Sequence, residues 1–180
     1  GPVSRGRVRL PNGWYLSPAG RQIELPDMRP IVIALSPDGR LLATSGKNKE
    51  IIVIDPDTTE IKQHVMLPSE KQNEPRPDTV SGNILQPDSK GQASFTGLKF
   101  SPDGKRLYFS NVNGSVKVFA VHGGGMLSAQ FSIPLPPVNA PKRKEEIPAG
   151  IAVSRDGKRL AVVRTESVRD AVLITSVEKK

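Results

Sequence analysis

A short turn, Ser-Pro-Asp-Gly, constrains this chain more than any other feature, because it recurs between apolar runs. It occurs at Ser36–Gly39 and Ser101–Gly104, and a variant with arginine in place of proline occurs at Ser154–Gly157. Proline presets φ near −65° at the first central position, and glycine accepts the left-handed conformation that completes the reversal. Since apolar residues flank each turn on both sides, each copy predicts a β-hairpin.

Further strands follow each hairpin. The sequence predicts third strands at Ile51–Ile54, Ser115–Phe119 and Ala171–Ile174, and fourth strands at Ile61–Leu67 and Met126–Leu135. The copies recur at intervals longer than the roughly 40–50 residues of a typical propeller blade, which predicts inserted loops. Glycine (16) and proline (17) are abundant, as short strands joined by many turns require. We therefore expect an all-β fold with about three four-stranded antiparallel β-propeller blades.

The third unit has no fourth strand in this sequence, but the N-terminal part offers a spare one. Its residues are Arg21, Gln22, Ile23, Glu24 and Leu25, and propellers often close by such a pairing. Three blades are too few for a ring, which usually has about four to eight, and open ends would expose strand edges. We expect another chain or a missing C-terminal segment to complete the ring. A homodimer that exchanges its N-terminal strands would have about six blades.

These expectations divide the chain as follows. Residues 1–9 are a disordered linker that begins with a Gly-Pro typical of a cleaved tag, and residues 10–180 form a partial propeller. Its parts are the N-terminal hairpin and closing strand (10–27), blade one (28–67), a long loop (68–94), blade two (95–136), a second loop (137–147) and blade three without its last strand (148–180).

The face that carries the blade-to-blade connections is the predicted binding surface. Loops that join one blade to the next emerge beside the second-to-third-strand turns, and the long insertions lie there. The candidate binding residues on these loops are Arg29, Lys47, Asn48, Asn111, Asn113 and Arg164. The alternative for the asparagines is that they are present because asparagine favours turns.

Catalytic chemistry finds little support. The absence of cysteine excludes disulfides and thiolate chemistry. His64 and His122 lack metal-ligand spacing, and Ser36 and Ser101 lie in tight turns without a partner histidine. We therefore predict no catalytic residue, no metal and no cofactor. Apolar runs fall far short of the roughly 18 residues that span a bilayer, so no membrane partner is expected.

The formal net charge is +8, which attracts polyanions without a dedicated site. Several of the cations, including Arg5, Lys142 and Lys179, fall in expected linker, loop and terminal positions, where they can equally serve solubility. Nucleic acid is therefore a possible partner.

The rhythm of Ser36–Asp55 and Ser101–Phe119 resembles the YVTN or YncE-like β-propeller family. The opening segment Leu10–Leu25, LPNGWYLSPAGRQIEL, is similar to the start of bacterial proteins that join a YncE-like propeller to an alkaline-phosphatase-type phosphoesterase domain. The resemblance implies a periplasmic or secreted location. It also implies seven blades, whereas this sequence carries about three, and the phosphoesterase domain has no counterpart here.

Three functions follow as hypotheses. The first is a non-catalytic binding or scaffold propeller that associates with itself. The second is a polyanion-binding or DNA-binding propeller, as in DNA-associated members of the family. The third is a lactonase-like propeller enzyme fragment, which the lack of clustered acids and histidines disfavours.

Overall fold

A computed structural model gives the arrangement of the chain. It describes residues 3–4, 7–17, 19–69, 91–136, 147–164 and 170–177. Most of both predicted insertions, 70–90 and 137–146, lies outside these residues, as does the end of the predicted third unit, 178–180.

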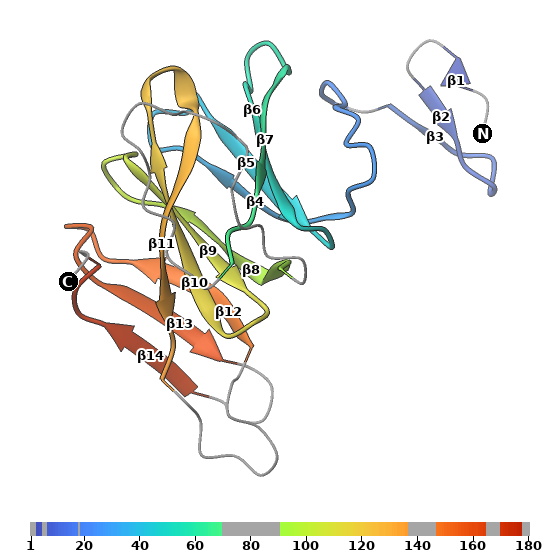
Figure 1. Ribbon diagram of the computed structural model, residues 1–180. Helices are drawn as coiled ribbons and strands as arrows, with labels where there is room; N and C mark the ends of the chain where they lie inside the picture. Colours follow the sequence, from blue (N-terminus) through green and yellow to red (C-terminus); the bar gives the residue numbers. More distant parts are fainter. Residues whose placement is uncertain are drawn as a thin grey trace.

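The described residues form an all-β fold of four antiparallel sheets (Figure 1). Sheet 1 contains β4 (Pro30–Leu35), β5 (Leu42–Gly46), β6 (Glu50–Ile54) and β7 (Ile61–Met66). Sheet 2 contains β8 (Ala93–Phe100), β9 (Arg106–Asn111), β10 (Ser115–Val121) and β11 (Leu127–Pro134). Sheet 3 contains β12 (Pro148–Val153), β13 (Leu160–Arg164) and β14 (Asp170–Ile174). A small N-terminal sheet contains β1 (Val3–Ser4), β2 (Arg7–Arg9) and β3 (Tyr15–Leu16). The expectation of an all-β, antiparallel fold is confirmed.

The three predicted hairpin turns share one hydrogen-bonded structure. In the first, the Ser36 hydroxyl donates to Asp38 Oδ1 at 2.6 Å and accepts the Leu41 amide at 2.9 Å. Ser101 and Ser154 make the same two contacts in their turns. The glycine has a positive φ in each case, for example +71° at Gly104. The serine therefore connects the two strands, and the aspartate holds the serine.

Sheets 1, 2 and 3 pack face to face in sequence order. β4 lies beside β8, and β8 lies beside β12, so the first strands of the three sheets are neighbours. Val32 and Val53 of sheet 1 share a buried cluster with Leu98 and Phe100 of sheet 2. The opposite face of sheet 2 forms a second cluster with sheet 3, in which Val118 takes part. Sheet 2 is thus covered on both faces.

Polar contacts between sheets fix their relative positions. The buried side chain of Gln63 on β7 donates to the Leu127 carbonyl at 3.0 Å and accepts the Leu127 amide at 2.7 Å. Between sheets 2 and 3, the Ser110 hydroxyl donates to the Ala149 carbonyl at 2.8 Å. A Cβ on Gly97 would lie 2.0 Å from Ser110 Oγ and 2.3 Å from that carbonyl. Only glycine fits where these strands approach.

The N-terminal region departs from the prediction. Arg21–Leu25 forms no strand; instead, Ile23 and Leu25 pack against a cluster that contains Ile52 and Ile54 on sheet 1. Alternating apolar residues suit either a strand or a segment lying across an apolar face, and here the open face of sheet 1 receives them. Arg7–Arg9, which we expected in a disordered linker, pairs as β2 with β3. The loop predicted to end at residue 94 ends earlier, because β8 begins at Ala93.

Candidate functional site

The described ends of the predicted blade-to-blade loops lie on one face of the molecule, beside two of the turns. Connections that precede β4, β8 and β12, together with the β5–β6 and β9–β10 turns, surround a groove of about 350 Å³. Arg29 and Lys47 line it from the sheet 1 side, and Gln92 and Val112 line it from sheet 2. The Lys47 amide donates to the Arg29 carbonyl at 3.2 Å, which joins the backbones of these two exposed residues.

The three predicted asparagines take part in turn hydrogen bonds. Asn48 Oδ1 accepts the Glu50 amide at 3.4 Å, and its Nδ2 donates to Glu50 Oε1 at 3.1 Å. Asn111 is fully buried, and Asn113 Oδ1 accepts the Ser115 hydroxyl at 2.8 Å. These contacts match the alternative in which asparagine serves the turn.

Arg164 is held within the chain rather than exposed at the groove. Its guanidinium is buried, pairs with Asp170 through two hydrogen bonds, and donates to the Pro136 carbonyl at 2.6 Å. The Arg164 hydrogen bond lowers the pKa of Asp170. The side chain therefore joins the ends of β13 and β14 to the segment after β11. Of the six predicted residues, the groove gathers Arg29 and Lys47.

A second candidate surface consists of two sheet faces that no other described residue covers completely. On sheet 1, Ile31, Ile33 and Leu35 project away from sheet 2 and are 46%, 65% and 56% exposed. Ile31 and Ile33 border an apolar hollow of about 400 Å³ that Ile23 and Leu25 also line. On sheet 3, Val163 and Leu173 are 45% and 61% exposed. We call these the sheet 1 end face and the sheet 3 end face.

The end faces were not predicted from the sequence, although a signal for one of them is present. In β4, PIVIAL, apolar residues occupy both alternating sets of positions. A strand that is apolar on both sides is typical of a strand covered on both faces. Because sheet 2 covers one face of β4, the other requires a partner or remains exposed.

Within the described part of the chain, no group of three His, Cys, Asp or Glu residues could hold a metal ion. No helix among the described residues is long and apolar enough to cross a membrane.

Comparisons with known proteins show a likeness of fold and no family. No family model matches the chain, and no curated protein matches it. A solved structure titled Kuenenia stuttgartiensis hydrazine synthase superposes with a TM-score of 0.57 over 87% of this chain at 20% sequence identity. This chain spans 35% of the length of that one. At this identity, the likeness concerns the arrangement of strands alone.

Proposed function

We propose that this chain is an open segment of a β-propeller, a non-catalytic binding module that associates with a second copy through its two end faces. The meander order within sheets 1 and 2, and the neighbouring first strands β4, β8 and β12, are typical of propeller blades around an axis. The hairpin motif and the opening segment, which resemble YncE-like propellers, agree with this proposal.

One comparison between the repeats carries the proposal. Strand pairing makes Leu35 the counterpart of Phe100, because Leu35 pairs with Leu42 as Phe100 pairs with Leu107. Phe100 is 4% exposed because sheet 1 covers it, whereas Leu35 is 56% exposed. The face of sheet 2 that corresponds to the sheet 1 end face thus packs against the preceding sheet.

The sheet 3 end face is the complementary surface. Leu173 pairs with Ala161 as Val118 pairs with Tyr108, so Leu173 corresponds to Val118. Val118 is fully buried against the sheet that follows it, and Leu173 is 61% exposed. Each end of the chain therefore offers one half of an interface. The same interface forms twice within the chain, between sheets 1 and 2 and between sheets 2 and 3.

A second copy supplies the missing half at both ends. Head-to-tail contacts form a ring when the rotation closes, and two copies with three sheets each provide six, within the usual range of about four to eight blades. Strand exchange by Arg21–Leu25 is a separate step. It requires Ile23 and Leu25 to leave the sheet 1 cluster that they contact here, so the proposal rests on the end faces rather than on exchange.

Molar mass in solution tests the association. Light scattering on the purified chain is expected to give twice the mass of one chain at micromolar concentration. Leu173→Asp places a charge in the sheet 3 end face and should shift the mass to that of a monomer. Leu16→Asp is the matched control, because Leu16 is an exposed leucine in the small N-terminal sheet. A folded wild-type monomer at all concentrations overturns the proposal.

A second candidate function, polyanion binding, is favoured by the net charge of +8 and by exposed Arg29 and Lys47 at the groove. A labelled oligonucleotide should bind more weakly as salt rises, because bound counterions are released. Arg29→Gln combined with Lys47→Gln should reduce both the affinity and the salt slope. Absence of binding at low salt eliminates this candidate.

A further inference from the structure

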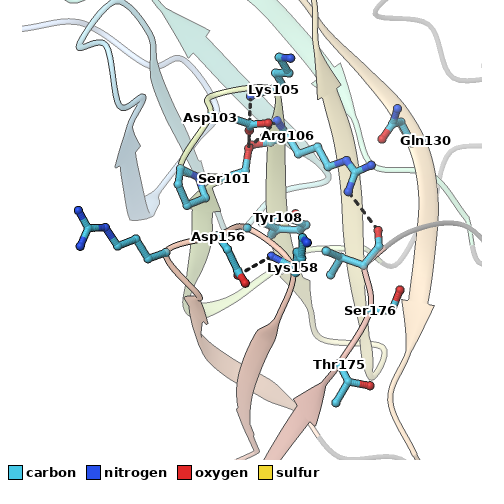
Figure 2. Close-up of a pocket in the computed structure, with 14 residues that line it drawn as sticks. Ser101, Asp103, Lys105, Arg106, Tyr108, Gln130, Asp156, Lys158, Thr175 and Ser176 are labelled. Carbon is cyan, nitrogen blue, oxygen red and sulfur yellow. Dashed lines mark hydrogen bonds between the residues drawn. The ribbon is translucent and has the colours of Figure 1, made fainter.

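A cleft of about 830 Å³ lies between sheets 2 and 3, at the end of the molecule that carries the hairpin turns. The turn from Ser101 to Arg106 forms one wall, the turn from Arg155 to Lys158 forms another, and Thr175–Val177 form a third. Figure 2 shows Arg106 and Tyr108 along the sheet 2 wall, with Gln130 on the neighbouring strand β11. The cleft lies at the opposite end of the sheets from the groove of Arg29 and Lys47.

A second cleft, of about 490 Å³, lies at the equivalent place between sheets 1 and 2 and can be compared with the first. There, buried Leu41 packs so tightly on Gly125 that a Cβ on that glycine would lie 2.2 Å from Leu41 Cδ2. Arg106 occupies the position of Leu41, since each accepts the turn-serine amide through its carbonyl. The residue two positions later, Ala43 in the first repeat, is Tyr108 in the second. The wider cleft therefore has a cation and a phenol where the narrower one is apolar.

The wider cleft is also positively charged. Lys105, Arg106, Arg155 and Lys158 line it, opposed by Asp103 and Asp156. Both carboxylates are occupied within their own turns, where each accepts a serine hydroxyl and a backbone amide. Among the described residues, no ion pair engages these four cations. In the narrower cleft, by contrast, Asp55 and Asp57 add negative charge and Lys62 pairs with Asp55 at 3.4 Å.

Gln130 Oε1, a buried polar atom of the cleft lining, has no hydrogen-bond partner among the described residues, and the buried Tyr108 hydroxyl has only the Arg106 guanidinium beside it. Tyr108 is fully buried. Burial raises its pKa, although nearby Arg106 opposes that shift, so the hydroxyl keeps a proton to donate at neutral pH. Arg106 Nη1 donates to the Val177 carbonyl at 3.2 Å, which anchors the guanidinium at the cleft wall. Native proteins rarely leave such groups unpaired.

We propose that this cleft binds a small organic anion that carries a phosphate or carboxylate group and at least one hydroxyl group. The anionic oxygens accept hydrogen bonds from Arg106 and from the Tyr108 hydroxyl, because guanidinium groups match these oxyanions well. The ligand hydroxyl donates to Gln130 Oε1. The remaining cations of the lining attract the anion to the cleft.

Calorimetric titration with glucose 6-phosphate, citrate, inorganic phosphate and uncharged glucose tests the proposal. Glucose 6-phosphate or citrate should bind, inorganic phosphate should bind more weakly, and glucose should not bind. Arg106→Leu, which installs the first repeat's residue, should weaken binding at least about tenfold, the usual scale for a lost charge-assisted hydrogen bond. Arg40→Leu is the matched control, because Arg40 lines the narrower cleft, and it should leave the affinity unchanged.

Tyr108→Phe separates a ligand role from a structural one. Because Arg106 is the one hydrogen-bond partner that the described residues place beside the hydroxyl, removal of the hydroxyl should change the melting temperature without ligand little, while ligand binding weakens severalfold. A lower melting temperature with unaltered binding assigns the hydroxyl to the fold and overturns its ligand role. Failure of every anion to bind overturns the proposal, as does equal loss of binding in Arg40→Leu and Arg106→Leu, which marks diffuse charge attraction. Neither outcome bears on the association of copies.

Discussion

Three residues of each hairpin turn, a serine, an aspartate and a glycine, together stabilise the chain reversal. The serine hydroxyl bridges the strands, the aspartate accepts that hydroxyl, and the glycine takes the left-handed backbone. The chain reversal and the left-handed glycine follow from the residue types alone, so the sequence predicts the turns correctly, whereas the serine bridge was not predicted. Arg164 illustrates the limit: its pairing with Asp170 and Pro136 depends on segments that only the folded chain brings together.

Gly104→Ala tests the backbone requirement of these turns. Gly104 has a φ of +71°, and an added Cβ would meet only ordinary contact, with Pro37 Cδ at 3.7 Å. The cost is therefore the left-handed conformation itself, about 1–2 kcal/mol of the free energy of unfolding. Denaturant unfolding measures it. Gly123→Ala, at an open position without a positive φ, should cost far less, and equal losses would contradict the account.

Acid should weaken the fold through the same turns. Serine hydrogen bonds, followed by backbone amides, lower the pKa of Asp38, Asp103 and Asp156 in the folded chain. Their stabilisation is complete above the unfolded carboxyl pKa of about 3.9 and is lost as pH falls through the lower folded values. Urea midpoints should thus decline below about pH 4. Asp103→Asn should make that decline shallower; an unchanged slope would contradict this assignment.

At the scale of the strands, local sequence pattern predicts much of the fold. The expected third strand at Ile51–Ile54 is β6 (Glu50–Ile54), and the expected fourth strand at Ile61–Leu67 is β7 (Ile61–Met66). Arg21–Leu25 was wrong as a strand, since alternation does not identify what a segment contacts. The pairing of Gln63 with Leu127 joins residues from different sheets, and no local pattern indicates it.

Gln63→Ala tests that contact between sheets. The variant leaves the amide and carbonyl of fully buried Leu127 without their partner. Unpaired buried groups cost about 1–3 kcal/mol, so the free energy of unfolding should fall by that amount. Gln22→Ala changes an exposed glutamine and serves as control. If both variants unfold at the wild-type midpoint, the contact does not hold the sheets together.

At the scale of the whole molecule, the two end faces set the behaviour that we propose. At one end, exposed Ile33 and Leu35 correspond to Leu98 and Phe100, which are buried inside the chain. At the other end, exposed Leu173 corresponds to buried Val118. The repeat in the sequence predicts such end faces only when strand pairing assigns each residue to a side. The cleft of Arg106 and Tyr108 likewise becomes apparent only when the repeats are aligned, because Leu41 and Ala43 occupy the same positions in the first repeat.

Complementation between two variants tests the head-to-tail association most directly. Ile33→Asp blocks the sheet 1 end face, and Leu173→Asp blocks the sheet 3 end face, so each variant alone should have the mass of a monomer by light scattering. An equimolar mixture retains one intact pair of faces and should form a dimer with one copy of each. A mixture that stays monomeric, beside a dimeric wild type, or a dimer of either variant alone, would contradict the account.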